Sequence, residues 1–272
     1  MLLTIDIGNT NTVLGIYRGT ELLDHLRIES RKSATSDEYG ALVATLLSQR
    51  GVPLDAVRHA IIGSVVPPLT TMFEGLCRRW FGHEPMVIGP GVRTGMPILY
   101  DNPREVGADR IVNAIAAYER CGRACIVVDF GTATTFDVIS DKGEYLGGVI
   151  VPGIGISADA LFSRAAKLPR VEIVRPRNVI GKTTVEAIQS GLVFGYVGLI
   201  EGLVARISAE LDAQPAVIAT GGLAQLISRE SSVVDEVVEF LTLDGLRMVW
   251  ARNEHTRSPG ARSATTRRGG RT

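Results

Sequence analysis

Two short segments of the chain carry the same pattern of carboxylate, glycine and hydroxyl residues directly after a β-type apolar run. The first is Asp6-x-Gly8-Asn9-Thr10 and the second is Asp129-x-Gly131-Thr132. Glycine in a tight turn lets a ligand approach the backbone, whose N–H groups can then bind phosphate oxygens. An Asp at the end of a strand can hold Mg²⁺, usually through water. Either segment alone is better explained as a plain Asp-Gly hairpin turn, but the pair favours binding of one nucleotide's phosphates.

These two segments belong to an internal repeat. Residues 5–16 read IDIGNTNTVLGI and residues 128–139 read VDFGTATTFDVI, so a shift of 123 places Asp6 on Asp129 and Thr12 on Thr135. Turn residues follow each copy, which predicts a β-hairpin at the start of an α/β domain. A unit this long indicates duplication of a whole domain and not a solenoid. We therefore expect an α/β fold of two domains, at residues 1–117 and 118–252, facing each other across a cleft.

A third segment with chemical potential is Gly107-Ala108-Asp109-Arg110, near the start of a predicted helix. The Asp109 carboxylate can accept a proton, and the Arg110 guanidinium offers a fork for a substrate carboxylate. The alternative is structural, since an Asp in the first helical turn suits the helix dipole. The spacing alone does not decide between the two. Thr220-Gly221-Gly222 similarly follows a strand and is either a backbone platform for adenosine or a helix-entry turn.

Periodicity and end signals predict the elements that hold these segments. An Asn-Pro-x-Glu start at residue 102 and a Thr-x-x-Glu capping box at residue 183 begin two of the helices. The predicted helices cover residues 36–50, 69–81, 102–120, 156–167, 183–211 and 243–252, and the strands beyond the first hairpin cover 60–65, 86–88, 124–129, 134–140, 144–151 and 216–219.

The apolar stretch 188–207 approaches the length of a membrane span. It contains Gln189, Glu201 and Arg206, and a long buried helix explains it better. Its four glycines, at 191, 195, 198 and 202, fall on one helical stripe, and each costs about 1 kcal/mol relative to Ala. The stripe predicts close helix packing, either within the chain or across a two-fold axis.

Overall charge and cysteine usage narrow the class of ligand and the compartment. Lys+Arg and Asp+Glu both total 29, so the chain lacks the basic field of a nucleic-acid or anionic-membrane binder. Three cysteines make no disulfide framework, and the N-terminus shows no export signal, which together predict a cytoplasmic protein. Cys121 and Cys125 lie too far in sequence from any histidine to favour a zinc site. Residues 253–272 hold five Arg and predict a disordered basic tail, with contact to RNA or acidic lipid as the alternative.

Together these motifs resemble the type III pantothenate kinases, within the actin/hexokinase/heat-shock-ATPase superfamily of duplicated ribonuclease-H-like domains. The resemblance runs from Leu2 to about Arg252. It rests on DIGNT (6–10), TGMPILYDNPREVGADR (94–110), VDFGTATTFDV (128–138), GGVIVPG (147–153), GKTTVEAIQSG (181–191) and TGG (220–222). The GADR block with the DNP before it is the specific part, since DIGNT alone would fit many relatives.

The resemblance implies ATP-dependent phosphorylation of the primary hydroxyl of pantothenate, the first step towards coenzyme A. It implies that Asp109 is the proton acceptor, that Asp129 holds a monovalent cation (K⁺ or NH₄⁺), and that the protein is a homodimer. Asp6 is a candidate Mg²⁺ ligand through water. The implied ATP-binding residues are Asp6, Ile7, Gly8, Asn9, Thr10, Asn11, Thr12, Val13 and Thr132. The implied pantothenate-binding residues are Tyr100, Gly107, Ala108, Asp109, Arg110 and Thr184.

Two other functions remain open at the level of sequence. One is a different enzyme of the same architecture, such as a sugar or acetate kinase or an exopolyphosphatase-like hydrolase. The other is a nucleotide-binding regulator that has lost phosphoryl transfer. The presence of Asp6, Asp109 and Asp129 argues against the second.

Overall fold

The structure is a computed structural model that describes residues 1–165 and 167–257. It contains two five-stranded sheets. The first sheet has the order β3-β2-β1-β4-β5, from β1 (Leu2–Ile7), β2 (Asn11–Arg18), β3 (Glu21–Glu29), β4 (His59–Ser64) and β5 (Met86–Val87). The second has the order β8-β7-β6-β9-β10, from β6 (Cys125–Phe130), β7 (Ala133–Ile139), β8 (Tyr145–Pro152), β9 (Ala216–Gly221) and β10 (Glu236–Val237).

The two sheets have the same topology. In each, three antiparallel strands are extended by two strands that run parallel to the first. The same order of strands in both halves is the structural form of the sequence repeat. The expected α/β fold of two duplicated domains is therefore confirmed.

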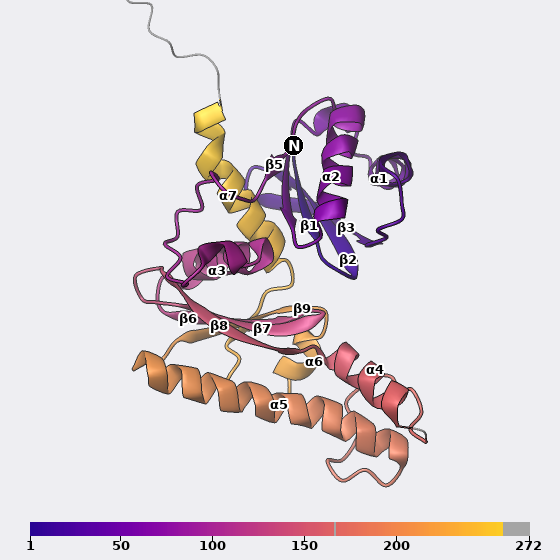
Figure 1. Cartoon of the computed structure of the whole chain (residues 1–272), viewed down its shortest axis with the longest axis vertical. Helices are drawn as coiled ribbons and strands as arrows, with labels where there is room; N and C mark the ends of the chain where they lie inside the picture. Colours follow the sequence, from indigo (N-terminus) through magenta and orange to yellow (C-terminus); the bar gives the residue numbers. More distant parts are fainter. Residues whose placement is uncertain (166, 258–272) are drawn as a thin grey trace, which may run out of the picture.

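The helices form layers on both faces of each sheet (Figure 1). The outer face of the first sheet is covered by α1 (Ser36–Gln49) and α2 (Pro67–Leu76). On the outer side of the second sheet lie α4 (Ile154–Arg164), α5 (Thr184–Leu211) and α6 (Ala224–Ser228). Two helices, α3 (Ala108–Cys121) and α7 (Leu241–Arg257), lie between the sheets. α3 contacts strands of both sheets, and α7 contacts α3 and strands of the first sheet.

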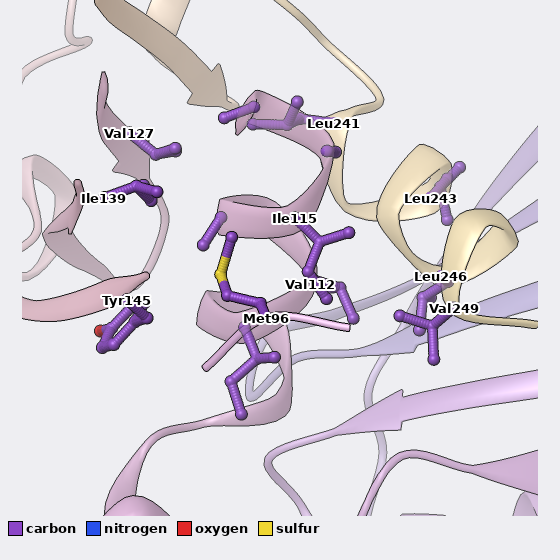
Figure 2. Close-up of a cluster of buried hydrophobic side chains, with 14 of the residues drawn as sticks. Met96, Val112, Ile115, Val127, Ile139, Tyr145, Leu241, Leu243, Leu246 and Val249 are labelled. Atoms are coloured by element: carbon purple, nitrogen blue, oxygen red, sulfur yellow. The ribbon is translucent and has the colours of Figure 1, made fainter. Parts of the chain in front are cut away.

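The layer between the sheets has its own apolar core (Figure 2). Side chains of α3, such as Val112 and Ile115, lie between the second sheet and α7. The sheet contributes Val127 and Ile139 to this core, and α7 contributes Leu243, Leu246 and Val249. A Cβ at Gly245 would lie 2.1 Å from the Val112 carbonyl oxygen, so the two helices pack with their backbones close together. This packing fixes α3 relative to both sheets.

Strand alternation explains why the two Asp residues face this middle layer. In β1, Leu3, Ile5 and Ile7 point to the outer core beneath α1 and α2. Asp6 therefore points to the opposite face, towards α3 and α7. In β6, Ile126 and Val128 likewise belong to the outer core beside α5, which places Asp129 on the inner face.

The register of the two hairpins corrects one part of the repeat. β1 pairs Ile7 with Thr12, whereas β6 pairs Phe130 with Thr134. The second turn is one residue shorter than the first, so Thr12 corresponds to Thr134 and not to Thr135. The constant shift of 123 is correct up to the turn and wrong beyond it.

Several elements differ from the sequence predictions. The helix expected from residue 102 is wrong at its start: Pro103–Glu105 forms a 3₁₀ turn, the extended Val106 interrupts it, and α3 begins at Ala108. α7 runs to Arg257, five residues into the expected tail, and residues 258–272 of that tail lie outside the described residues. The strand β3 was not predicted. The short elements α6 and β10 were not predicted either, because five and two residues show no periodicity. The domain bounds 1–117 and 118–252 stay a prediction.

Helix α5 is buried on one face only. Leu192, Val193 and Ile200 pack on the second sheet, but a Cβ on Gly191, Gly195 or Gly198 would meet nothing within 4 Å. The prediction of a wholly buried helix is therefore wrong on its glycine side. In the part of the chain that the structure describes, α5 is the one helix long and apolar enough to cross a membrane. Its packing on the sheet is also that of a core helix in a globular domain, so length and composition do not establish a span.

Candidate active site

The turns of the two hairpins meet at a pair of hydroxyl groups. Oγ1 of Thr10, between β1 and β2, lies 3.1 Å from Oγ1 of Thr132, between β6 and β7. Both side chains are exposed, as are Asn9 and Gly131 beside them. The two Asp-x-Gly turns, which come from different sheets, therefore present donors to a single place on the surface.

Three carboxylates lie behind this pair of hydroxyls. Burial, together with the negative charges of Asp109 and Asp129, raises the pKa of Asp6 to about 8, against the opposing charge of Arg27. Burial and the charge of Asp109 raise the pKa of Asp129 to about 7. Such mutual repulsion requires the three side chains to be close, although they come from β1, α3 and β6. Sequence reasoning predicted all three residues, and the structure brings them together.

Asp129 is fixed by two neighbours. The amide Nδ2 of Asn113, one helical turn after Asp109 on α3, donates to Oδ2 of Asp129 at 3.2 Å. Oδ1 of Asn113 is buried and has no hydrogen-bond partner in the described residues. On the other side, Gly221 has φ +92° and a Cβ there would lie 2.5 Å from Oδ1 of Asp129. The Thr-Gly-Gly segment therefore makes room for the Asp129 carboxylate, a role that its sequence did not reveal.

The carboxylate cluster fits a bound cation. None of the three Asp side chains forms a salt bridge within residues 1–165 and 167–257, and burial raises the pKa of each of them. No group of three or more His, Cys, Asp or Glu with metal-binding geometry occurs among those residues. Mg²⁺ is commonly held by one or two carboxylates together with substrate phosphates and water, which matches a site of this kind.

Asp109 is held at the N-terminus of α3. The backbone N–H of Arg110 donates to its Oδ1 at 2.8 Å. A Cβ on Gly107 would lie 2.5 Å from the same oxygen, so glycine at the N-cap allows the carboxylate to fold back over the helix end. Burial raises the pKa of Asp109. Asp109 is thus a half-buried carboxylate whose charge acts on Asp6 and Asp129 and whose Oδ1 is bound at the helix end.

Arg110 is held by two residues that the sequence did not single out. Its Nε donates to Oδ1 of Asp137 at 2.7 Å, and the hydroxyl of Tyr145 donates to the same oxygen at 2.7 Å. A bulge in the β7–β8 ladder, where Val138 pairs with Gly147 but Ile139 pairs with Tyr145, turns Tyr145 to the face of Asp137. A charged residue at an inward position of a β-strand, as Asp137 is, was the signal available in the sequence.

Tyr100 lies beside this group. A Cβ on Gly147 would be 3.7 Å from the Tyr100 ring, and the rings of Tyr100 and Tyr145 have centroids 6.4 Å apart. Tyr100 and the segment Gly107–Arg110 therefore lie near one another, and their binding of pantothenate stays a prediction.

Some predicted ligand residues are not part of this group. The Ile7 side chain lies in the outer core of the first sheet, Thr12 is buried with its hydroxyl 2.9 Å from that of Ser30, and Val13 packs against the middle layer. These three can reach a nucleotide only through their backbone. Thr184 is exposed at the first turn of α5, on the outer side of the second sheet, and no hydrogen bond in the described residues joins it to the other predicted site residues.

Comparison with known proteins decides the family. The family model for type III pantothenate kinase matches residues 2–206. A type III pantothenate kinase of Myxococcus xanthus is 59% identical over 253 residues, which cover 93% of this chain and 99% of that protein. One of Moorella thermoacetica is 56% identical over 93% of this chain and all of that protein.

The chain belongs to the type III pantothenate kinase family. The resemblance deduced from the motifs is thereby confirmed. Two solved structures share the fold of this kinase-family chain at low identity. A Baf family protein of Campylobacter jejuni has a TM-score of 0.58 at 18% identity, over 93% of this chain and 99% of that one. The ethanolamine utilization protein EutJ of Carboxydothermus hydrogenoformans has a TM-score of 0.54 at 17% identity, over 91% of this chain and 89% of that one.

Proposed function

We propose that this protein transfers the γ-phosphoryl group of ATP to the primary hydroxyl of pantothenate and forms 4′-phosphopantothenate, the first step of coenzyme A biosynthesis. The observation that carries the proposal is the meeting of Thr10 and Thr132 in front of the three carboxylates. The relatives that match nearly the whole chain are named for this activity.

Phosphoryl transfer needs alignment and charge neutralisation more than covalent chemistry, because its transition state is loose. The hydroxyls of Thr10 and Thr132 and the N–H groups of the first turn would bind phosphate oxygens from both sides. A divalent cation bound near Asp6 would neutralise phosphate charge. The residues of the two turns then hold the terminal phosphate in line with the acceptor hydroxyl.

Asp109 would align the acceptor hydroxyl and take its proton. Its Oδ1 is already bound by the Arg110 N–H, so Oδ2 is the oxygen that would accept from the substrate. Burial raises the pKa of Asp109 and makes it a stronger base than a solvated carboxylate. A well-placed base contributes about 10²–10⁴ in rate.

A monovalent cation, K⁺ or NH₄⁺, would bind at Asp129. The proposal is supported by the raised pKa of this carboxyl and by the unpaired Oδ1 of Asn113 close to it. A cation there would keep Asp129 ionised and would reduce its repulsion of Asp6.

A homodimer is supported by an exposed apolar face around α4 and the start of α5. Most of the large hydrophobic side chains exposed in the described residues lie here, namely Ile150, Ile156, Leu161, Phe162, Val174, Val179, Ile180 and Val185. Ile180 is 82% exposed, and the open glycine side of α5 belongs to the same part of the molecule. Apolar groupings of this kind usually mark interfaces. Thr184 lies on this face, so a second copy would receive it as part of its pantothenate site.

A coupled assay of ATP consumption tests the function directly. The expected result is turnover with pantothenate and Mg²⁺, stimulated by K⁺ or NH₄⁺, with a product heavier than pantothenate by one phosphoryl group. A panel of sugars and short carboxylic acids serves as the control for other kinases of this architecture. Turnover with a member of that panel and none with pantothenate would refute the assignment, as would ATP binding without any acceptor. A cytoplasmic location stays a prediction from composition.

A further inference from the structure

Arg110 has a hydrogen-bonding group that the protein itself does not use. The side chain is buried, with 8% of the residue exposed, and its Nε is bound to Oδ1 of Asp137. Its Nη2 is buried and has no hydrogen-bond partner among the described residues. A buried guanidinium nitrogen without an acceptor is costly, so a partner supplied from outside the chain is expected to bind there.

The surroundings of Nη2 relate it to the residues implied for pantothenate binding. A Cβ on Gly148 would lie 2.6 Å from Nη2, so the nitrogen rests against a strand position that has no side chain. Gly147 follows the bulge with φ +136° and faces the Tyr100 ring. Asp109, the proposed base, precedes Arg110 in the same helical turn. Nη2 therefore belongs to the part of the site assigned to pantothenate and not to the part where the two hairpins meet.

Asp137 and Tyr145 determine where this nitrogen lies. Asp137 is fully buried in β7, and Tyr145 is fully buried in β8. Arg110 Nε and the Tyr145 hydroxyl both donate to the same oxygen, Oδ1 of Asp137. The Tyr145 ring also lies under the guanidinium, with its centroid 5.9 Å from Cζ of Arg110. Oδ2 of Asp137 has no partner in the described residues. The ion pair therefore consists of a single hydrogen bond, from Nε to Oδ1, and leaves Nη2 unpaired.

We propose that Asp137 and Tyr145 are positioning residues, which act through Arg110 by holding its guanidinium so that Nη2 donates to an oxygen of the acceptor substrate. This inference rests on the proposed function, because it assumes that pantothenate is the acceptor. The preferred oxygen is the pantothenate carboxylate, since a guanidinium binds a carboxylate more strongly than a neutral oxygen.

Tyr145→Phe is the first test, because it removes one hydroxyl and keeps the buried ring. The KM for pantothenate is expected to rise roughly tenfold, as for one lost hydrogen bond to a charged group, while the KM for ATP changes little. Tyr17→Phe is a matched control. Tyr17 is also fully buried in the middle layer and its hydroxyl donates to a carboxylate, that of Asp244, at 2.8 Å. Equal effects of the two variants on the KM for pantothenate would overturn the proposal.

Asp137→Asn combined with Arg110→Met separates positioning from direct contact. Arg110→Met is expected to raise the KM for pantothenate and to lower the Tm, because it leaves the Asp137 carboxylate buried without its partner. In the double variant the Tm is expected to recover, while the KM for pantothenate stays at the value of Arg110→Met. A further rise of that KM in the double variant would show that Asp137 contacts the substrate itself and would contradict the proposal.

Pantothenyl alcohol, with a hydroxymethyl group in place of the carboxylate, identifies the oxygen. The unmodified protein is first assayed with saturating pantothenate, and absent turnover there would refute the proposed function itself and not the positioning role. Tyr145→Phe is expected to raise the KM for pantothenate about tenfold more than it raises the KM for the alcohol. Equal weakening of both compounds would overturn the assignment of the carboxylate. An unchanged KM for both in Tyr145→Phe would overturn the positioning role, and would indicate that Nη2 closes an internal fork with Oδ2 of Asp137.

Discussion

The hydroxyl of Thr10 lies 3.1 Å from the hydroxyl of Thr132, although the two residues are 122 positions apart and belong to different sheets. Each follows an Asp-x-Gly segment at the end of the first strand of its sheet. The contact therefore joins the two halves of the duplicated fold at the point where a phosphate chain would be bound by both. The carboxylates of Asp6 and Asp129 lie behind it because strand alternation turns both towards α3.

Removal of either hydroxyl is expected to weaken ATP binding. Thr10→Val and Thr132→Val should each raise the KM for ATP roughly tenfold or more, as for a lost hydrogen bond to a charged group, with little change in the KM for pantothenate. Because the two hydroxyls are expected to bind the same phosphate, the KM for ATP in the double variant should rise by less than the product of the two single-variant increases. Thr132→Ser keeps the hydroxyl and is the control. Additive effects, or a change in the pantothenate KM alone, would argue against a shared phosphate site.

Asp109→Asn is expected to lower kcat by about 10²–10⁴ and to leave the Tm and the affinity for ADP close to the parent values. The amide keeps the size of the side chain but cannot take the proton of the acceptor hydroxyl. Asp101→Asn, at an exposed carboxylate shortly before α3, is the control. Unchanged kcat in Asp109→Asn would exclude this residue as the base.

The raised pKa values of Asp6 and Asp129 predict a dependence of stability on pH. Between about pH 4 and pH 8 the folded protein holds protons on these groups, at pKa values of about 8 and about 7, that the unfolded chain has released. Their contribution to stability is therefore present at low pH and is lost as pH rises through this window. Thermal unfolding without nucleotide should show a Tm that falls from pH 5 to pH 8.5 less steeply in Asp129→Asn than in the parent protein. A parallel slope in both proteins would contradict the assigned shift.

The same groups should link cation binding to protons. Mg²⁺ bound beside Asp6 requires the carboxylate to be ionised, so binding releases a proton where the site is still protonated. The affinity for Mg²⁺-nucleotide should rise with pH, by at most about tenfold per pH unit for each proton released. Calorimetric titrations in two buffers of different ionisation enthalpy measure the proton count, and a count of zero at pH 6.5 would count against the cluster.

Gly221→Ala is expected to destabilise the protein by more than about 1 kcal/mol. Its φ of +92° disfavours any residue with a Cβ, and that Cβ would lie 2.5 Å from Oδ1 of Asp129. Displacement of Asp129 should also reduce activation by K⁺. Gly222→Ala is the matched control, because its Cβ would meet nothing within 4 Å. Similar Tm and K⁺ activation in the two variants would show that the close approach at Gly221 is unimportant.

The exposed apolar face predicts the effect of a charge at Ile180. Ile180→Glu should shift the protein from dimer to monomer in light scattering, because it places a carboxylate in the proposed interface. Its KM for pantothenate should rise in parallel if Thr184 is supplied by the second copy. Leu42→Glu introduces the same charge at an exposed leucine on α1, away from this face, and should leave the dimer intact. A monomeric parent protein would contradict the proposed assembly.

The duplicated fold could be predicted because Asp6 and Asp129 mark the same hairpin twice and because helix and strand periods are clear between them. The length of the second turn could not be predicted, since Thr134 and Thr135 fit a strand equally well. Only the pairing of Phe130 with Thr134 in the structure shows which of them follows the turn. The sequence also could not show that α7 returns to the first sheet, because its apolar residues fit any inner layer.

The candidate site was predicted where a motif places polar residues in a turn or at a helix start. Asp6, Asp109, Asp129 and Thr132 are of this kind. Asn113 and Asp137 were missed because they lie inside a helix and a strand, and their function depends on which buried group they meet across the fold. The role of Gly221 likewise depends on a neighbouring strand, and no local pattern reports it.

A crystal structure with a non-hydrolysable ATP analogue and Mg²⁺ tests the central claim most directly, through the distances from the terminal phosphate oxygens to the two threonine hydroxyls. We expect the hydroxyls of Thr10 and Thr132 each to donate to the phosphate chain at hydrogen-bonding distances of about 2.5–3.0 Å, with Asp6 and Asp129 beside the cations. A triphosphate bound by one hairpin alone, with the other turn remote from it, would contradict the claim.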